Sequence, residues 1–216
     1  MSYDICLFDL DGTLTDPKEG ITKSVQFALS SFGIGEDLSN LTKFIGPPLR
    51  ESFHNFYGLD GEEGEKAVAK YREYFTRFGI FENSVYPDIP KLLADLKKRD
   101  KTLALATSKP TLYACQILEH FRLDRYFSYI SGDEMDGSRT KNGKKEIIQS
   151  ALTNIYVKNN MSIVMIGDRK HDVLGAKDAL IDGIGITWGY GSKEELSLAG
   201  AVKIADTASQ LYDMII

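Results

Sequence analysis

The stretch that decides the fold class of this chain reads Ile5-Cys6-Leu7-Phe8-Asp9-Leu10-Asp11-Gly12-Thr13-Leu14-Thr15-Asp16. Its first four residues are apolar and predict a short buried strand. Asp9 and Asp11 follow at the end of that strand, and side chains two positions apart in an extended segment point the same way. Two close carboxylates repel each other unless a cation or a shared proton relieves the charge. Because hard cations such as Mg²⁺ take oxygen ligands, the stretch favours a metal site over an ordinary turn at Asp11-Gly12.

Composition and charge place the chain among globular proteins. It has 216 residues, of which 43% are hydrophobic and 26% charged, so we expect one large domain or a main domain with a smaller insertion. The net charge of −5 argues against a nucleic-acid-binding face, which would be basic, and no apolar run is long enough to span a membrane. The start Met1-Ser2-Tyr3-Asp4 lacks the basic residues of a signal peptide. We therefore expect a cytoplasmic protein with reduced cysteines and with no nucleic-acid, membrane or evident protein partner.

Residues 17–80 carry the apolar spacing of helices and no convincing strand. Four helical faces are separated by stops at Gly33, Gly46-Pro47-Pro48, Gly58 and Gly79. The apolar residues of each face recur three or four positions apart, which is the period of a helix with one buried side. This range is therefore predicted to be an all-helical block inserted after the first strand.

Beyond the helical block, the chain alternates between helical patterns and short apolar runs. The runs most typical of buried strands are 103–107 and 162–166, and weaker candidates are 126–131, 184–187 and 201–205. Strands that alternate with helices form a parallel sheet covered on both faces. We predict an α/β protein with a doubly wound, Rossmann-like parallel-sheet core over residues 1–16 and 81–216, and an inserted all-helical domain over residues 17–80.

Polar clusters follow the predicted strands. In open parallel sheets, ligand sites form beyond the carboxyl ends of the strands. Besides the paired aspartates, the clusters are Thr107-Ser108-Lys109, the basic segment 141–145, and 167–172, which reads Gly-Asp-Arg-Lys-His-Asp. Each alone is ordinary, since Thr-Ser after a strand is often a helix cap and lysines before a helix usually lie in solvent. Their joint occurrence at strand ends predicts a single site.

The order of these motifs resembles the haloacid dehalogenase superfamily. That family combines Asp-x-Asp-Gly-Thr-Leu-x-Asp, a strand followed by Thr-Ser, a lysine that opens a helix, and Gly-Asp-x-x-x-Asp, and each motif has a counterpart along this chain. The helical block occupies the place of the family's helical cap domain. Further stretches are similar to the phosphoglycolate phosphatase-like branch: Asp16-Pro17-Lys18-Glu19-Gly20-Ile21, Ile45-Gly46-Pro47-Pro48-Leu49, Gly137-Ser138-Arg139-Thr140 and Thr187-Trp188-Gly189-Tyr190-Gly191.

The resemblance implies a phosphatase that works through an aspartyl-phosphate. Asp9 corresponds to the family's nucleophile. Asp11 corresponds to the general acid and base, and its backbone carbonyl also ligates Mg²⁺. Asp168 completes the metal site, with Asp172 as a further ligand or as support for one. The resemblance thus predicts a Mg²⁺ site formed by Asp9, Asp11, Asp168 and Asp172.

The resemblance also implies groups that bind the anionic substrate, a small phosphorylated metabolite. A phosphate ester repels an attacking carboxylate, so a metal and a lysine must neutralise the charge. Thr107, helped by the amide of Ser108, is expected to hydrogen-bond the phosphoryl oxygens. The lysine is predicted as Lys144 from the register of the following helix, with Lys141 as the alternative. Arg50, beside the Gly-Pro-Pro loop, is a candidate contact for an acidic group of the substrate.

Other functions use parts of the same pattern. The preferred prediction is a Mg²⁺-dependent, phosphoglycolate phosphatase-like enzyme, and the alternatives within the superfamily are a 5′-nucleotidase and a phosphosugar mutase. A receiver-like phospho-aspartate signalling module would need only a smaller, uninterrupted domain. Asp11 also argues against it, because such a module must keep its phospho-aspartate stable. A dehalogenase has no use for Asp11 or for a metal. A catalytically inactive interaction protein is disfavoured because every catalytic position is filled.

Overall fold

The computed structural model describes residues 2–141, 143–158 and 160–216. The chain divides into two compact units. The larger unit consists of Met1–Thr15 and Val85–Ile216, and the smaller unit consists of Asp16–Ser84. Each unit buries apolar side chains of its own, as expected of separate domains.

The larger unit is built on a six-stranded sheet with the strand order β5-β4-β1-β6-β7-β8. All neighbouring strands in it are parallel. The strand order reverses beside β1, and in such sheets ligand sites lie beyond the carboxyl ends of the strands at that point. The strands are β1 (Ile5–Phe8), β4 (Thr102–Pro110), β5 (Tyr129–Asp133), β6 (Ile163–Gly167), β7 (Asp182–Ile186) and β8 (Lys203–Ala205).

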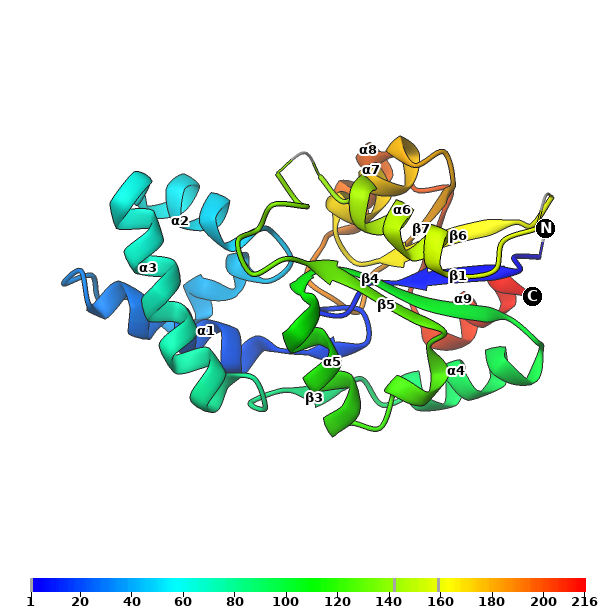
Figure 1. Cartoon of the computed structure of the whole chain (residues 1–216), viewed down its shortest axis with the longest axis horizontal. Coiled ribbons are helices and arrows are strands. Elements are labelled where there is room, and N and C mark those ends of the chain that lie inside the picture. Colours follow the sequence, from blue (N-terminus) through cyan, green and yellow to red (C-terminus); the bar gives the residue numbers. More distant parts are fainter. Residues whose placement is uncertain (1, 142, 159) are drawn as a thin grey trace. The chain divides into compact units, whose positions relative to one another are not determined.

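Helices cover both faces of this sheet (Figure 1), with α6, α7 and α8 on one face and α4, α5 and α9 on the other. All four residues of β1 are therefore fully buried, which explains their continuous apolar run. Under α6, Leu7 packs in one cluster with Ala104, Ile148 and Met165. The helices are α4 (Ile89–Lys98), α5 (Thr111–His120), α6 (Lys145–Asn154), α7 (Lys170–Asp178), α8 (Lys193–Ala199) and α9 (Ala208–Ile215).

The predicted α/β fold, with its doubly wound parallel sheet and helical insertion, is confirmed. The bounds of the later strands shift by up to three residues from the sequence prediction, and the two largest shifts are at the start of β5 and the end of β4. The predicted strand 126–131 begins only at Tyr129, because Asp124–Tyr126 forms a short 3₁₀ helix, η3. β4 continues past residue 107 to Pro110, with a shift in its pairing register against β5 between Ala106 and Pro110. Such a bulge is not visible in apolar spacing, because it depends on the partner strand.

The smaller unit is helical between its two ends. In it α1 packs against α3 and η1. A Cβ atom on Gly20 of α1 would lie 1.9 Å from the carbonyl oxygen of Gly79, so this close backbone contact needs a glycine. The helices are α1 (Lys18–Ser30), the 3₁₀ helix η1 (Leu38–Phe44), α2 (Leu49–Tyr57), α3 (Gly61–Tyr74) and the π-helix η2 (Phe75–Gly79).

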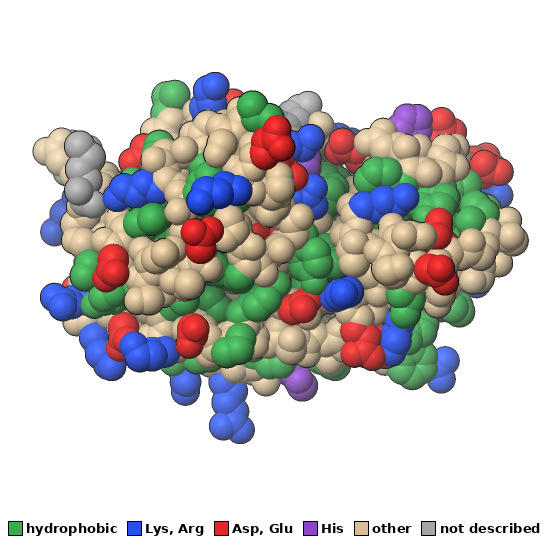
Figure 2. All heavy atoms as spheres, turned by 180° about the vertical axis from the view of Figure 1, so that it is seen from behind, with side chains coloured by type: hydrophobic (Ala, Val, Ile, Leu, Met, Phe, Trp, Pro, Cys, Tyr) green, Lys and Arg blue, Asp and Glu red, His purple; other side chains and the backbone are tan. Residues whose placement is uncertain are grey.

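Two short strands, β2 (Thr15–Asp16) and β3 (Ser84–Val85), pair with each other where the chain passes from one unit to the other. Figure 2 shows acidic and basic side chains interspersed over the face that it presents, without a region of a single charge sign. Among the described residues, no helix has the length and apolar character needed to cross a membrane.

Candidate active site

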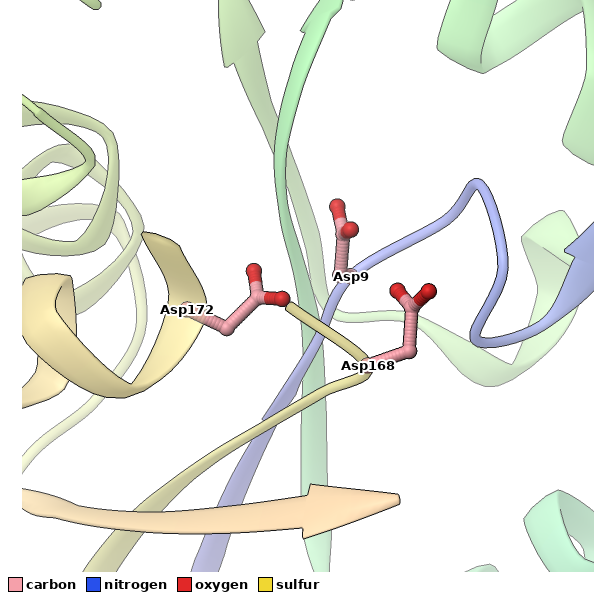
Figure 3. A group of neighbouring side chains, drawn as sticks. All are labelled: Asp9, Asp168 and Asp172. Carbon is pink, nitrogen blue, oxygen red and sulfur yellow. The ribbon is translucent and has the colours of Figure 1, made fainter. Parts of the chain in front are cut away.

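Three buried aspartates meet at the carboxyl ends of β1 and β6 (Figure 3). One carboxylate oxygen from each of Asp9, Asp168 and Asp172 lies within 4.8 Å of the other two. The sheet explains the encounter, because β1 and β6 are neighbours with Phe8 opposite Ile166, and the N–H of Asp9 donates to the Ile166 carbonyl at 2.9 Å. Asp168 follows β6, and Asp172 lies in the first turn of α7. Three buried carboxylates this close form a plausible donor set for a hard divalent cation.

Asp168 is enclosed by two loops that approach it closely. The Thr13 hydroxyl donates to its Oδ1 at 3.3 Å, and the Tyr190 N–H donates to its Oδ2 at 2.7 Å. A Cβ atom on Gly12 would lie 2.3 Å from Asp168 Oδ2, and a Cβ atom on Gly189 would lie 2.4 Å from Asp168 Cβ. Both glycines therefore stand where any side chain would collide with the aspartate.

Asp172 is held by the start of its own helix. The N–H of Arg169, the residue before α7, donates to Asp172 Oδ2 at 3.0 Å. Beside it, a Cβ atom on Gly167 would lie 2.1 Å from Asp172 Cγ. The carboxylate is thereby fixed at the N-terminus of α7, where a negative charge is favoured.

Lys144 lies among these carboxylates. Its Nζ is 2.8 Å from Asp9 Oδ1 and also contacts Asp172 Oδ1, and its side chain is only 1% exposed. Of the other lysines nearby in sequence, Lys141 and Lys145 are both exposed. The start of α6 explains the difference, since Ile147 is buried against the sheet and the residue just before the helix faces the same interior. The structure thus brings Lys144, and neither neighbour, against Asp9.

The pKa values of the clustered aspartates and of Lys144 are shifted by burial and by one another's charges. Burial, together with the charges of Asp172 and Asp9, raises the pKa of Asp168 to about 8. Burial also raises the pKa of Asp172 to about 6, although the charge of Lys144 opposes this rise. Burial alone would lower the pKa of Lys144, but the charges of Asp172 and Asp9 outweigh it and raise that pKa above its ordinary value. One ammonium thus faces three carboxylates, and the excess of negative charge suits a bound divalent cation.

The remaining predicted residues of the larger unit lie at the end of β4 and in the turn after β1. Thr107 is buried, and its Oγ1 accepts a hydrogen bond from the Lys109 N–H at 3.3 Å, while Ser108 is half-buried. The side chain of Asp11 is not in the acidic group, because its Oδ2 pairs with Lys109 Nζ at 2.7 Å. Burial raises the pKa of Asp11 against the opposing charge of Lys109.

Sequence reasoning did not single out several groups that contact the site. The sequence marks Lys109 only as part of the Thr-Ser-Lys run, and it does not predict the contacts of Thr13 and of the Tyr190 amide with Asp168. Trp188 belongs to the same surroundings, since its Nε1 donates to the Thr13 carbonyl at 3.1 Å. The sequence signals for these groups are that they follow strands and that Thr13, Trp188 and Tyr190 fall in stretches that resemble the family.

Arg50 belongs to the smaller unit. It lies in the first turn of α2, where its Nη2 pairs with Glu65 Oε2 at 2.9 Å. The side chain of Arg50 is 38% exposed. Close to it in sequence, the Lys43 ammonium lies 4.6 Å from the centre of the Phe56 ring. The guanidinium of Arg50 is therefore engaged with an acidic side chain of its own unit.

A strand-end aspartate held by a buried lysine, beside a cluster of carboxylates on a doubly wound sheet, defines an enzyme of phosphoryl-transfer chemistry. The chain belongs to the haloacid dehalogenase-like hydrolases, whose family model matches residues 6–186. Within this family it is a phosphatase, a class that acts on phosphorylated small molecules. The buried aspartates of this fold are consistent with a divalent metal site.

Similar proteins carry related names. A 5′-nucleotidase from Pseudomonas aeruginosa is 49% identical over 197 residues, which are 91% of this chain and 88% of that protein. A crystal structure described as a predicted phosphatase from Clostridium acetobutylicum is 47% identical, with a TM-score of 0.94 over 100% of this chain and 99% of the other. The tyrosine-protein kinase PtkA of Mycobacterium tuberculosis is 37% identical over 209 residues, 96% of this chain and 70% of that protein.

The comparisons distinguish between the activities predicted for this family. Phosphoglycolate phosphatase from Vibrio parahaemolyticus is only 25% identical, over an alignment of 217 positions that covers 96% of this chain and 94% of that protein. The family-level prediction of a phosphatase is confirmed. Within that class, however, the similarities favour the alternative of a 5′-nucleotidase over the preferred phosphoglycolate phosphatase-like activity.

Proposed function

We propose that this protein is a Mg²⁺-dependent phosphatase that hydrolyses nucleoside 5′-monophosphates through an aspartyl-phosphate on Asp9. The observation that carries the chemistry is the contact of Lys144 with Asp9 inside the group of buried carboxylates. The ammonium keeps a positive charge beside the attacking oxygen, where an anionic phosphate ester must approach.

The metal ligands proposed are Asp9, Asp168 and Asp172 together with the backbone carbonyl of Asp11. The three side chains supply hard oxygen donors within 4.8 Å of one another, and their mutual repulsion supports the binding of a dication. When bound, Mg²⁺ neutralises charge on the phosphoryl group and on the attacking carboxylate.

The proposed reaction has two steps. The phosphoryl group is first transferred to Asp9 and then to water, and Asp11 acts first as an acid and then as a base. In the first, an Asp9 oxygen bonds to phosphorus while the bond from phosphorus to the leaving oxygen breaks, and Asp11 gives that oxygen a proton. In the second, water attacks the phosphorus of the aspartyl-phosphate and gives its proton to Asp11. Inorganic phosphate is released, and both aspartates return to their starting states.

Groups around Asp9 are proposed to hold the phosphoryl oxygens during both steps. Thr107 lies in β4, the strand beside β1, and is buried, and the amide of Ser108 follows directly after it. With Lys144, these groups provide donors fixed by the protein, so little rearrangement is needed when charge develops.

The substrate class is proposed from the similarity to the 5′-nucleotidase, which extends over most of both chains. We further propose that the helical block predicted at residues 17–80 acts as the cap that selects the leaving group, with Arg50 as a contact for its acidic groups. The partly exposed side chain of Arg50 supports this role.

The test is a comparison of kcat/KM over several phosphate monoesters with Mg²⁺. The panel contains the nucleoside 5′-monophosphates, the matching 3′-monophosphates, 2-phosphoglycolate and glucose 1-phosphate. We expect release of inorganic phosphate to be fastest from the 5′-monophosphates. A higher kcat/KM for 2-phosphoglycolate than for every nucleotide would overturn the substrate proposal, and conversion of glucose 1-phosphate to an isomer would identify a mutase.

The phosphatase mechanism is tested separately from the substrate. With 4-nitrophenyl phosphate, turnover should stop when the divalent ion is removed by chelation and return when Mg²⁺ is added. Turnover that survives complete chelation would contradict the metal role. A phospho-enzyme that persists for many minutes without hydrolysis would favour a phospho-aspartate signalling module.

A further inference from the structure

Lys109 and Asp11 form a buried ion pair that the proposed steps do not use. Lys109 Nζ lies 2.7 Å from Asp11 Oδ2, and the two side chains are only 7% and 12% exposed. Exposed ion pairs contribute little because solvent screens them, but breaking a buried pair leaves an uncompensated charge. The contact is therefore strong enough to fix the direction of the Asp11 carboxylate.

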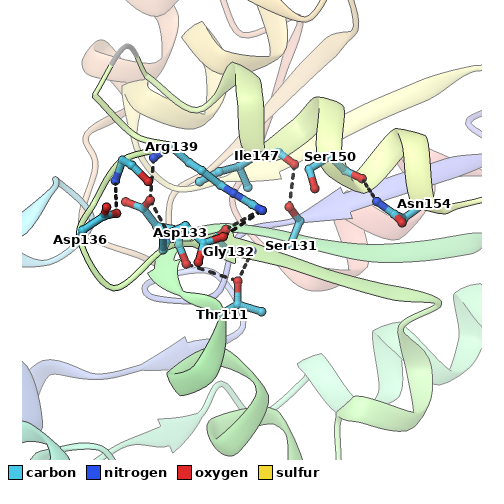
Figure 4. Close-up of polar contacts among 11 residues, drawn as sticks. Thr111, Ser131, Gly132, Asp133, Asp136, Arg139, Ile147, Ser150 and Asn154 are labelled. Carbon is cyan, nitrogen blue, oxygen red and sulfur yellow. Dashed lines mark hydrogen bonds and ion pairs between the residues drawn. The ribbon is translucent and has the colours of Figure 1, made fainter.

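The backbone around Lys109 is fixed before its side chain reaches Asp11. Its N–H donates to Thr107 Oγ1, and a Cβ atom on Gly132 of the neighbouring strand β5 would lie 2.5 Å from the Lys109 carbonyl oxygen. Figure 4 shows Gly132 held in turn by the Thr111 hydroxyl, which accepts the Gly132 N–H at 3.1 Å. The register shift of β4 spans this segment, and bulges of this kind redirect side chains next to active sites.

The backbone of Asp11 is equally constrained by the turn that follows it. The N–H of Gly12 donates to the Thr15 carbonyl at 2.8 Å, and the N–H of Leu14 donates to the Leu10 carbonyl at 2.9 Å. These bonds hold the turn in place, and the contact to Lys109 opposes rotation of the Asp11 carboxylate.

The two oxygens of Asp11 are not equivalent. Oδ2 is occupied by Lys109, whereas Oδ1 is buried and has no hydrogen-bond partner among residues 2–141, 143–158 and 160–216. Buried acceptors without a partner are rare in proteins and call for an explanation, such as a catalytic role. An oxygen that must receive and release a proton has to be left without a permanent donor.

We propose that Lys109 is a positioning residue for proton transfer, which holds Asp11 by Oδ2 and leaves Oδ1 to carry the proton. The proton on Oδ1 passes to the leaving oxygen as its bond to phosphorus breaks, and it is replaced from the water that attacks the aspartyl-phosphate. This inference rests on the proposed function, because it assumes that Asp11 is the general acid and base.

The dependence of rate on the leaving group tests the inference. Protonation matters more as the leaving group becomes more basic, so a misplaced acid slows poor leaving groups most. The substrates are aryl phosphates of similar size that release 4-nitrophenol, phenol or 4-methylphenol. For Lys109→Met, we expect kcat/KM to fall about tenfold more for the 4-methylphenyl ester than for the 4-nitrophenyl ester, a difference well within the scale of general acid catalysis. An equal loss over the series would overturn the proposal.

The matched control is Lys91→Met. Lys91 also pairs with an aspartate at 2.8 Å within the larger unit, but its side chain is 82% exposed. This variant should keep the normal rates across the series. Lys109→Arg, which retains a donor for Oδ2, should recover part of the loss. If Lys109→Met does not fold, as judged by thermal unfolding, the milder Lys109→Gln carries the same comparison.

A double-mutant cycle separates positioning from direct contact with substrate. In an Asp11→Asn background, removing Lys109 should cause no further loss, because its effect passes through Asp11. A full additional loss in that background would overturn the proposal and assign Lys109 to the substrate. If Asp11→Asn itself is as active as the unaltered enzyme, the proposed function fails. If Asp11→Asn is slow but Lys109→Met is normal, only the present inference fails.

Discussion

The ammonium of Lys144 touches two carboxylates at once, Asp9 Oδ1 at 2.8 Å and Asp172 Oδ1. The residues come from the end of β1, the entrance of α6 and the start of α7, so one cation ties three separate segments together. Its raised pKa keeps it charged throughout the neutral range. A site with this fixed charge attracts an anionic substrate before any reaction begins.

Replacement of the buried lysine should be far more damaging than replacement of its neighbours. Lys144→Ala removes the charge beside Asp9, and we expect kcat/KM for 4-nitrophenyl phosphate to fall by on the order of 10² or more. Lys141→Ala and Lys145→Ala change exposed residues and serve as matched controls. Steady-state kinetics on the three variants checks the expectation, and a larger loss in Lys141→Ala would move the role to that residue.

Substitutions by Asn should distinguish the catalytic roles of Asp9 and Asp11. Asp9→Asn should abolish turnover, since an amide does not attack phosphorus. Asp11→Asn keeps the nucleophile but loses the proton carrier, so we expect a decrease of on the order of 10² to 10⁴. Rapid quenching followed by mass spectrometry should then detect phosphate on Asp9 in the Asp11→Asn variant with good leaving groups. Near-normal rates in Asp9→Asn would refute its assignment as the nucleophile.

The metal-free protein should lose stability as pH rises. The folded-state pKa of Asp168 is raised from 3.8 to about 8, and that of Asp172 is raised from 3.8 to about 6. Between about pH 4 and pH 8 these two groups therefore bind more protons in the folded state than in the unfolded state, and their contribution to the free energy of unfolding decreases with pH across this window. In the presence of a chelator, the melting temperature should be lower at pH 8 than at pH 5.

Asp168→Asn should reduce this pH dependence, because it removes one of the three crowded carboxylates. Added Mg²⁺ should raise the melting temperature of the unaltered protein, and more so at pH 8 than at pH 5, since a ligand that binds only the folded state stabilises it. A melting temperature that rises from pH 5 to pH 8 without metal would contradict the interpretation.

A single methyl group near Asp168 should disturb the metal site. Gly189→Ala places a Cβ atom 2.4 Å from Asp168 Cβ and 2.3 Å from the Gly12 carbonyl oxygen. We expect weaker Mg²⁺ activation, seen as an increase in the concentration of Mg²⁺ needed for half-maximal rate. Gly35→Ala is the control, because no atom lies within 4 Å of its added Cβ. Equal Mg²⁺ dependence in both variants would show that the loop adjusts freely.

The two cysteines should differ in reactivity. Cys6 is fully buried in β1, and burial raises its pKa to about 12. Only the thiolate reacts with alkylating reagents, so Cys6 should resist iodoacetamide at pH 8 while the partly exposed Cys115 reacts more readily. Peptide mass spectrometry before and after denaturation measures the difference, and rapid labelling of native Cys6 would contradict the burial of this strand.

The local sequence determined the strands and the ends at which polar residues gather. Continuous apolar runs such as residues 5–8 and 162–166 predicted buried parallel strands, because a strand with helices on both faces has no wet side. Polar residues after these strands included Asp9 and Asp168, and the family resemblance added Lys144, which the structure brings together with them. Lys144 was favoured over Lys141 by the register of the following helix, which is a short-range property.

Only the tertiary structure decided which distant groups meet. Lys109 pairs with Asp11 from the segment in which β4 shifts its register against β5, and the Tyr190 amide contacts Asp168 from the loop after β7. The spacing of apolar residues does not predict such contacts, because it reflects which residues are buried and not which partner a polar atom has. The sequence by itself therefore determined the class of fold and the carboxylates of the site. The orientation of those carboxylates was decided by loops whose close approach requires Gly12 and Gly189, because a side chain at either position would occupy the space of Asp168.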